Sequence, residues 1–464
     1  MHYISTRGEA PRLDFEETML AGLARDGGLY VPEEVPRMAP DEIAALAGLP
    51  YEEAALRVIR PFVGGSFSES ELAGLIDAAY ASFGHKARVP LVELDPATFL
   101  MELHHGPTLA FKDVAMQLIG RLFDAVLTRR GTRVTIVGAT SGDTGSAAIE
   151  AFRGLASVDV FILFPEGRVS EVQRRQMTTP VEDNVHAIAI RGDFDDAQAL
   201  VKGLFNDHTF RDEVGLAGVN SINWARVLAQ TVYYFTAAVA LGGPHRPVRF
   251  VVPTGNFGDI YAGSVARAMG LPVERLVIAT NQNDILHRAL TTGEYRRGEV
   301  RPSISPSMDI QVSSNFERAL FEALDRDAAA VRRLMAALAG EGGFVIPAPA
   351  LERLRKIYAS GAATESETRA TIARVHAETG EIVCPHTAVG LKVAADLPAP
   401  RGVPTVALAT AHPAKFPDAV EEAIGIRPAL PPRMADLFER PERMHVIDND
   451  LAAVRDFIRR HRRG

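Results

Sequence analysis

The segment His105–Asp113 places a lysine where its side chain has little freedom to move. Lys112 follows a Gly-Pro turn and opens a run of apolar residues at helical spacing. This run predicts a helix with Lys112 at its N-terminus. The apolar positions of the run are Val114, Ala115, Leu118, Ile119, Leu122, Phe123, Val126 and Leu127. An isolated lysine at a helix start is normally a solvated surface residue. A lysine with a fixed position beside anion-binding loops is instead a candidate for chemistry. Three such loops follow along the chain.

The first of these loops is Gly138–Ala148, which directly follows an apolar run at Val134–Val137. Its glycines let a ligand approach the backbone, and its hydroxyls and amides lie at an expected helix start, where an anion is stabilised. A well-capped turn from strand to helix has the same pattern. The Gly-Lys-Ser/Thr ending of a Walker A loop is absent, which disfavours binding of a nucleoside triphosphate.

Two further segments have the same character. Pro253–Asp259 runs from an apolar strand into a glycine loop and a helix, so converging amides there are able to hold a phosphate without a cationic side chain. Asn220–Arg226 offers amide and hydroxyl donors at a helix start, with Arg226 one turn in, as a second anion site. An N-cap followed by an ordinary surface arginine is the competing interpretation of that segment.

The last segment, Ala409–Phe416, follows the final apolar strand and places Thr410 where a ligand of the sheet would contact it. His412 and Lys415 in the same loop receive no role. A constrained amine at Lys112 together with several anion sites favours a lysine that forms a Schiff base with a phosphorylated aldehyde cofactor.

Short apolar runs alternate with helical patterns from Arg133 onward, and this alternation predicts an α/β fold with mostly parallel sheets covered by helices. The expected strands are Val134–Val137, Val158–Phe164, Val185–Ile190, Val248–Val252, Leu276–Ala279 and Thr405–Ala409. Ligands of such sheets bind beyond the carboxyl ends of the strands, which is where the loops above fall.

The glycine- and proline-rich stretch Gly242–Pro247 predicts a boundary between two α/β lobes. We therefore expect a helical N-terminal subdomain (1–90), a small α/β domain (133–242), and a large domain (91–132 and 243–464) with added helices at about 325–385.

Composition excludes several classes of protein. The net charge of −8 gives no electrostatic case for a nucleic-acid or anionic-membrane partner. A single cysteine, Cys384, excludes an internal disulfide and a cysteine-rich metal site, and no metal is expected. No apolar stretch approaches about 18 residues, and the N-terminus lacks the apolar run of a signal peptide. We expect a cytoplasmic enzyme.

Eight segments, taken in order, resemble the threonine synthase family, which comprises pyridoxal-phosphate enzymes of the tryptophan-synthase β-subunit fold (fold type II). The match is closest to its longer branch with an extended N-terminal region. Each segment alone is weak evidence, whereas the ordered set across nearly the whole chain is highly specific. The segments are Asp26–Tyr30, His105–Asp113, Gly138–Ala148, Ser221–Arg226, Pro253–Asp259, Pro306–Arg318, Pro385–Ala388 and Thr410–Phe416.

The resemblance implies a cofactor site for pyridoxal 5'-phosphate in the large domain, with Lys112 bound to the cofactor aldehyde. Thr410 matches the hydroxyl partner of the pyridine nitrogen, which suits elimination and replacement chemistry rather than transamination. Asp143 stands where shorter relatives have an asparagine that contacts the phenolic oxygen of the cofactor. The residues that match the cofactor-phosphate loop are Gly255, Asn256, Phe257, Gly258 and Asp259.

The resemblance also implies that O-phospho-L-homoserine is the substrate and that water converts it to L-threonine and inorganic phosphate. Such an enzyme needs two phosphate sites, one for the cofactor and one for the leaving group, and this chain offers both. Lys112 would act as the catalytic base, and the chain would act as a monomer or a homodimer. The residues that match the substrate site are Thr140, Ser141, Thr144, Asn220, Ser221 and Arg226.

Two alternatives remain open from the sequence. A serine or threonine ammonia-lyase of the same fold would need one phosphate site and only a carboxylate site for its substrate. A catalytically silent binding protein would keep the fold without the chemistry, although an intact Lys112 argues against it.

Overall fold

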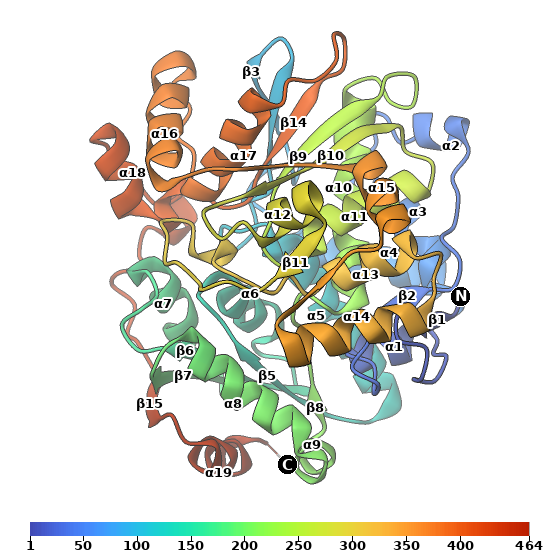
Figure 1. Cartoon of the computed structure of the whole chain (residues 1–464). Coiled ribbons are helices and arrows are strands. Elements are labelled where there is room, and N and C mark those ends of the chain that lie inside the picture. The colour runs from blue at the N-terminus through green and yellow to red at the C-terminus, as the bar shows by residue number, and fades with distance from the viewer. Residues whose placement is uncertain (464) are drawn as a thin grey trace.

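Two largely parallel sheets form the centre of the computed structural model, which describes residues 1–463 (Figure 1). Their central strands are buried along their whole length, which is expected when helices cover both faces of a parallel sheet. The predicted α/β class is therefore confirmed.

The larger sheet has six strands in the order β13-β10-β9-β14-β4-β3, and only β3 runs antiparallel to its neighbour. Its strands are β3 (Leu91–Asp95), β4 (Thr98–Glu102), β9 (Val248–Pro253), β10 (Val273–Thr280), β13 (Tyr358–Ala362) and β14 (Thr405–Ala409). The helices that follow or cover these strands are α5 (Lys112–Arg130), α10 (Trp224–Ala240), α11 (Gly258–Ala268), α12 (Ile285–Thr292), α13 (Phe316–Ala323), α14 (Ala328–Glu341), α15 (Ala348–Ile357), α16 (Glu365–Thr379), α17 (Pro385–Asp396) and α18 (Pro417–Ile424). Shorter pieces complete this region: β11 (Glu294–Arg296) pairs with β12 (Gly343–Val345), and single 3₁₀ turns occupy Pro306–Met308 (η1), Pro413–Lys415 (η2) and Pro432–Met434 (η3).

The smaller sheet has five parallel strands in the order β15-β7-β6-β5-β8. Its strands are β5 (Val134–Ala139), β6 (Val158–Pro165), β7 (Val185–Arg191), β8 (Leu216–Ala217) and β15 (His445–Asp448). Its helices are α6 (Asp143–Phe152), α7 (Glu171–Thr178), α8 (Phe194–Asn206), α9 (His208–Val214) and α19 (Leu451–His461).

The N-terminal region packs beside the larger sheet, on the right of Figure 1. Trp224 of α10 is almost fully buried and contacts the rings of Tyr3 and Phe62, so the region shares one core with the rest of the chain. Its elements are β1 (Tyr3–Ser5), α1 (Phe15–Ala21), β2 (Tyr30–Pro32), α2 (Pro40–Ala44), α3 (Tyr51–Val63) and α4 (Glu69–Tyr80).

The structure differs from the predicted division at two places. Helix α10 was expected in the small domain but packs against α3, α5 and α11. Residues 445–461 were expected in the large domain, yet β15 pairs with β7 and α19 packs on the core of the smaller sheet. The expected added helices at 325–385 are present as α14, α15 and α16, and β13 between them forms the edge of the larger sheet.

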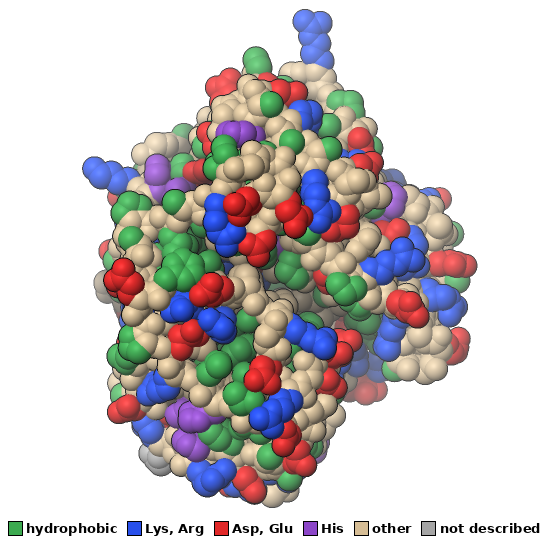
Figure 2. All heavy atoms as spheres, turned by 90° about the vertical axis from the view of Figure 1, so that its left-hand side faces the viewer, with side chains coloured by type: hydrophobic (Ala, Val, Ile, Leu, Met, Phe, Trp, Pro, Cys, Tyr) green, Lys and Arg blue, Asp and Glu red, His purple; other side chains and the backbone are tan. Residues whose placement is uncertain are grey.

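The surface carries charges of both signs. Figure 2 shows lysine and arginine side chains interspersed with aspartate and glutamate over the face it displays. Among the described residues, no helix is both long and apolar enough to cross a membrane.

Candidate active site

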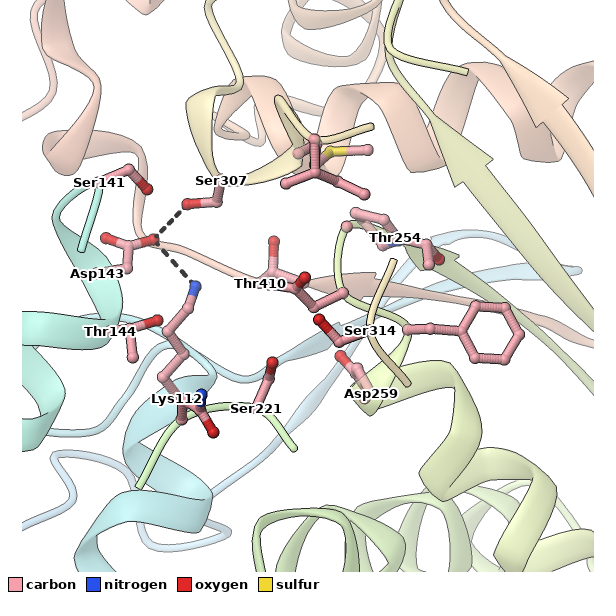
Figure 3. A pocket seen from close by; sticks show the side chains of 18 of the residues that line it. Lys112, Ser141, Asp143, Thr144, Ser221, Thr254, Asp259, Ser307, Ser314 and Thr410 are labelled. Carbon is pink, nitrogen blue, oxygen red and sulfur yellow. Dashed lines mark hydrogen bonds and ion pairs between the residues drawn. The ribbon is translucent and has the colours of Figure 1, made fainter. Parts of the chain in front are cut away.

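A cavity of about 210 Å³ lies where loops from the two sheets meet, and Figure 3 shows it from close by. Three parallel strands, β5, β9 and β14, end at loops that line it, as expected for a ligand site of α/β sheets. The structure brings every predicted site residue to this one cavity: Lys112, Thr140, Ser141, Asp143, Thr144, Asn220, Ser221, Arg226, Gly255, Asn256, Phe257, Gly258, Asp259 and Thr410.

Lys112 is the first residue of α5, and the surrounding chain fixes its position. The Phe111 amide donates to the Thr410 carbonyl at 2.8 Å, which joins the two loops on either side of the cavity. Asp113 accepts hydrogen bonds from the amide and the hydroxyl of Thr108, at 2.8 and 2.6 Å. Burial lowers the pKa of the Lys112 amine against the opposing effect of Asp143. A lysine with such a pKa holds more of its amine in the neutral, nucleophilic form.

Asp143, at the start of α6, lies at the centre of a charged network. Its Oδ2 is 3.5 Å from Lys112 Nζ and accepts a hydrogen bond from the Ser307 hydroxyl at 3.3 Å. Its Oδ1 is 2.8 Å from Lys415 Nζ and accepts from Gln173 Nε2 at 2.9 Å. Burial acts to raise the pKa of Asp143, but the neighbouring lysines, Lys415 more than Lys112, outweigh it and hold that pKa well below its usual range. Asp143 is therefore an anion that faces Lys112.

Gly142 precedes Asp143 and allows the turn into α6. Its φ of 133° belongs to a region that side chains with a Cβ rarely adopt, and a Cβ there would lie 2.3 Å from the Gln173 amide carbon. Thr140 Oγ1 accepts from the amides of Gly142 and Gly145, both at 2.9 Å, so this hydroxyl shapes the loop. Among residues 1–463, the amides of Ser141, Asp143 and Thr144 donate to no protein acceptor. The loop thus presents free donors at a helix N-terminus.

The glycine loop after β9 offers a second set of free donors. The amides of Gly255, Asn256, Phe257 and Gly258 have no acceptor within the part of the chain that the structure describes. Phe257 has φ 64°, and its left-handed conformation turns the chain into α11. A Cβ on Gly255 would lie 2.7 Å from the Ser307 carbonyl oxygen, so this position has room only for glycine. Main-chain donors converging at a helix start form a site for a phosphate.

Polar side chains behind this loop bond to two of its carbonyl groups, whereas its amides have no acceptor among residues 1–463. Ser313 Oγ donates to the Gly255 carbonyl at 2.6 Å, and Asn315 Nδ2 donates to the Asn256 carbonyl at 2.9 Å. The Asp259 carboxylate bonds to the hydroxyls of Tyr233 and Tyr234 on α10. The side chain of Asp259 is therefore bonded to α10, and only the main chain of Asp259 is comparable with the other residues of the glycine loop.

Arg226 lies in the first turn of α10 and lines the cavity with a cationic side chain. Its side chain is buried, and within residues 1–463 its Nε and Nη1 have no hydrogen-bond partner. Burial lowers its pKa to about 10, although Tyr233 and Asp259 act in the opposite direction. A buried guanidinium without a partner is unfavourable, and an anion in the cavity would satisfy it. Asn220 and Ser221 line the cavity just before this helix.

Several residues of the cavity were not assigned from the sequence. His386 Nε2 accepts from the Ser307 amide at 3.2 Å, and burial lowers the pKa of His386 to about 3, so its ring is neutral. Ser314 and Gln230 also line the cavity. His386, Ser307 and Ser314 lie in segments that carried the family resemblance, which was the only signal in the sequence for them. Among residues 1–463, no group of three or more His, Cys, Asp or Glu side chains is arranged to hold a metal ion.

Three family models together match most of the chain. Residues 2–80 match the threonine synthase N terminus, residues 83–352 the pyridoxal-phosphate-dependent enzymes, and residues 387–458 the threonine synthase C-terminal region. The chain belongs to the threonine synthase family. It is therefore a pyridoxal-phosphate-dependent enzyme, as the sequence predicted.

Individual threonine synthases agree with this assignment over their full length. The protein from Pseudomonas aeruginosa is 54% identical and aligns with 99% of this chain and 98% of its own. The one from Methylobacillus glycogenes is 42% identical, with coverage of 99% and 100%. The crystal structure of pyridoxal-phosphate-bound threonine synthase from Brucella melitensis superposes with a TM-score of 0.97, at 56% identity and full coverage of both chains.

Proposed function

We propose that this chain converts O-phospho-L-homoserine and water to L-threonine and inorganic phosphate, and that the predicted site residues have the roles given above. The observation that supports this most directly is the presence of two separate anion sites beside one buried lysine. The glycine loop at Gly255–Gly258 offers main-chain donors, and Arg226 offers an unpartnered guanidinium. A substrate with its own phosphate accounts for both.

The residues present fit pyridoxal phosphate. The free amides of the glycine loop suit its phosphate, the Lys112 amine suits its aldehyde, and the Thr410 hydroxyl lines the same cavity (Figure 3). When bound, the cofactor supplies an electron sink for charge that develops on the substrate α-carbon.

Lys112 would act twice in this reaction. It first holds the cofactor, and once the substrate amine has taken its place, the freed amine accepts the proton of the substrate α-carbon. Burial favours this step because it keeps the pKa of Lys112 below its usual value. The reaction then removes a proton from Cβ and breaks the bond between Cγ and the phosphate oxygen. The hydroxyl of water ends on Cβ, while Cγ gains a proton and Cα regains the one it lost.

Arg226 and the neighbouring donors would stabilise the departing phosphate. Negative charge grows on the leaving oxygen as the bond breaks, and a buried cation with preorganised N–H groups stabilises that charge more than water does. The free amides of Ser141 and Thr144 and the side chains of Asn220 and Ser221 complete this cradle.

The competing function is an ammonia-lyase that acts on serine or threonine, which has no phosphate to place beside Arg226. The deciding experiment measures inorganic phosphate release from O-phospho-L-homoserine and ammonia release from threonine with the same purified protein. We expect phosphate release from the first substrate and little ammonia from the second. Ammonia release from threonine without phosphate release from O-phospho-L-homoserine would overturn the proposal. A protein without a visible cofactor band, in which borohydride fixes nothing to Lys112, would instead be a silent binding protein.

A further inference from the structure

Lys415 is a fully buried cation directly behind the cavity. Its side chain is 0% exposed, and its Nζ lies 2.8 Å from Asp143 Oδ1 and donates to the Thr108 carbonyl at 2.7 Å. Thr108 belongs to the segment that leads into Lys112, and Lys415 itself closes the turn η2 that follows Thr410. One ammonium group therefore joins three of the loops that surround the cavity.

Asp143 divides its two oxygens between two lysines. Oδ1 contacts Lys415 and Gln173, while Oδ2 faces Lys112 and Ser307 (Figure 3). The contact with Lys415, at 2.8 Å, is shorter than the contact with Lys112, at 3.5 Å. Because attraction between charges rises as they approach, Lys415 compensates more of the carboxylate charge.

We propose that Lys415 is a positioning residue of this active site: it takes up the charge of Asp143, so that Lys112 faces a neutral ion pair instead of a lone carboxylate. This inference rests on the proposed function, since it concerns the lysine that accepts the substrate proton. A lone buried carboxylate beside Lys112 would hold that amine as an ammonium, which cannot accept a proton.

The electrostatic surroundings of Lys112 agree with this arrangement. Burial lowers its pKa, Asp143 opposes the shift, and Arg226 and Lys415 add to it. The titratable and charged groups that face Lys112 come from five other elements: Asp143 from α6, Arg226 from α10, Asp259 from α11, His386 from α17 and Lys415 from η2. Lys415 is the cation among them that also contacts the carboxylate opposite Lys112.

Three variants test the proposal: Lys415→Met, Asp143→Asn, and the two combined. Methionine keeps the length of the side chain without its charge, and asparagine keeps the shape of the carboxylate. The measurement is the rate at which trace acetic anhydride labels Lys112 in the cofactor-free full-length protein between pH 6 and pH 10, followed by mass spectrometry. The midpoint of this curve reports the pKa of Lys112 without any turnover. The absorbance of the cofactor-loaded protein over the same pH range is the second readout.

We expect Lys415→Met to move the labelling midpoint to higher pH, because Asp143 then pairs with Lys112 alone. The neutral fraction of Lys112 below the midpoint should fall about tenfold. Asp143→Asn should move the midpoint the other way. The double variant should label within about threefold of the parent, since the two charges are removed together.

A folded Lys415→Met variant with the midpoint of the parent would overturn the proposal and leave Lys415 as a purely structural contact. If that variant does not fold, the double variant decides, because removing a whole buried pair leaves no unpaired charge behind. Its midpoint must then match that of the parent while Asp143→Asn differs from both. The proposed function is tested separately. If the parent protein does not release phosphate from O-phospho-L-homoserine, the proposed function is wrong, but the labelling result for Lys112 still stands.

Discussion

The two proposed anion sites of the cavity differ in the chemical groups that form them. The glycine loop at Gly255–Gly258 uses main-chain N–H groups at the start of α11 and has no cationic side chain of its own. The cradle at the start of α10 adds Arg226, a buried guanidinium without a protein partner. Both lie at helix N-termini, so the helix dipole is common to them and the guanidinium is the difference.

This difference fits the two phosphates that the proposed reaction requires. A cofactor phosphate keeps its charge throughout the reaction, and fixed dipoles that match its shape are enough to hold it. A leaving phosphate gains charge as its bond to carbon breaks, and a cation that strengthens its interaction at that moment accelerates the reaction. Four substitutions, ordered by expected effect, can break or sharpen the comparison.

The largest effect is expected for Lys112→Ala, because this residue serves both sites at once. In the proposed mechanism, its removal takes away the covalent anchor of the cofactor and the base that accepts the substrate proton. We expect turnover to fall by about 10³-fold or more, with circular dichroism and thermal unfolding close to those of the parent. Phosphate release within tenfold of the parent rate would show that the base lies elsewhere.

Arg226→Ala should reduce kcat/KM for O-phospho-L-homoserine by about 10²–10³-fold, the size expected when one charge-stabilising donor is lost. The cofactor should stay bound, and its absorbance band reports this directly. Arg226→Lys is the matched control that keeps the charge, and it should recover part of the loss. A variant that loses its cofactor instead would show that the two cradles were assigned the wrong way round.

Gly255→Ala should weaken cofactor binding by about tenfold. The added Cβ would lie 2.7 Å from the Ser307 carbonyl, and shifting the loop to relieve this contact costs about 1–3 kcal/mol. Titration of cofactor-free protein with pyridoxal phosphate, followed by absorbance, measures the change. Gly74→Ala is the control, because a Cβ at Gly74 meets no atom within 4 Å. Unchanged affinity in Gly255→Ala would argue against a phosphate at this loop.

The smallest effect is expected for Asp259→Asn, which should change how the stability of the fold depends on pH. Burial raises the pKa of the Asp259 carboxyl group to about 6, against hydrogen bonds from Tyr233 and Tyr234. The protonated form therefore stabilises the fold fully below the ordinary pKa of about 4, and this contribution is lost as pH rises through about 6. Asp259→Asn should gain about 1–3 kcal/mol of stability relative to the parent between pH 4 and pH 7. Parallel thermal unfolding curves at both pH values would contradict this.

The sequence predicted strands whose residues are mainly apolar, such as Val158–Phe164, which the structure extends to Pro165, because strands buried on both faces have few polar positions. It missed β13, since Tyr358–Ala362 consists mainly of small residues. Gly361 there packs against Val393, where a Cβ would come within 2.8 Å. It also missed β15, whose partner β7 lies about 250 residues earlier in the chain. Local patterns carry no information about such pairings.

The same limit applies to the cavity. The loops Gly138–Ala148 and Pro253–Asp259 could be recognised from the sequence because the glycines and main-chain amides that line the cavity belong to the loops themselves. The role of Lys415 could not be recognised in this way, since nothing around it in the sequence indicates that its ammonium group contacts Asp143. The contact of His386 could not be recognised either, because its partner Ser307 comes from a different loop. A side chain whose role depends on a distant residue is visible only in three dimensions.

The pairing of β15 with β7 also has a consequence for how the protein is made. While the ribosome is still producing residues 192–444, the outer edge of β7 has no neighbour, although most of the smaller sheet already exists as sequence. An open, apolar edge is a template for strands of other chains. Newly made chains should therefore be most prone to aggregate, and most dependent on chaperones, in the interval before residues 445–461 emerge and close that edge.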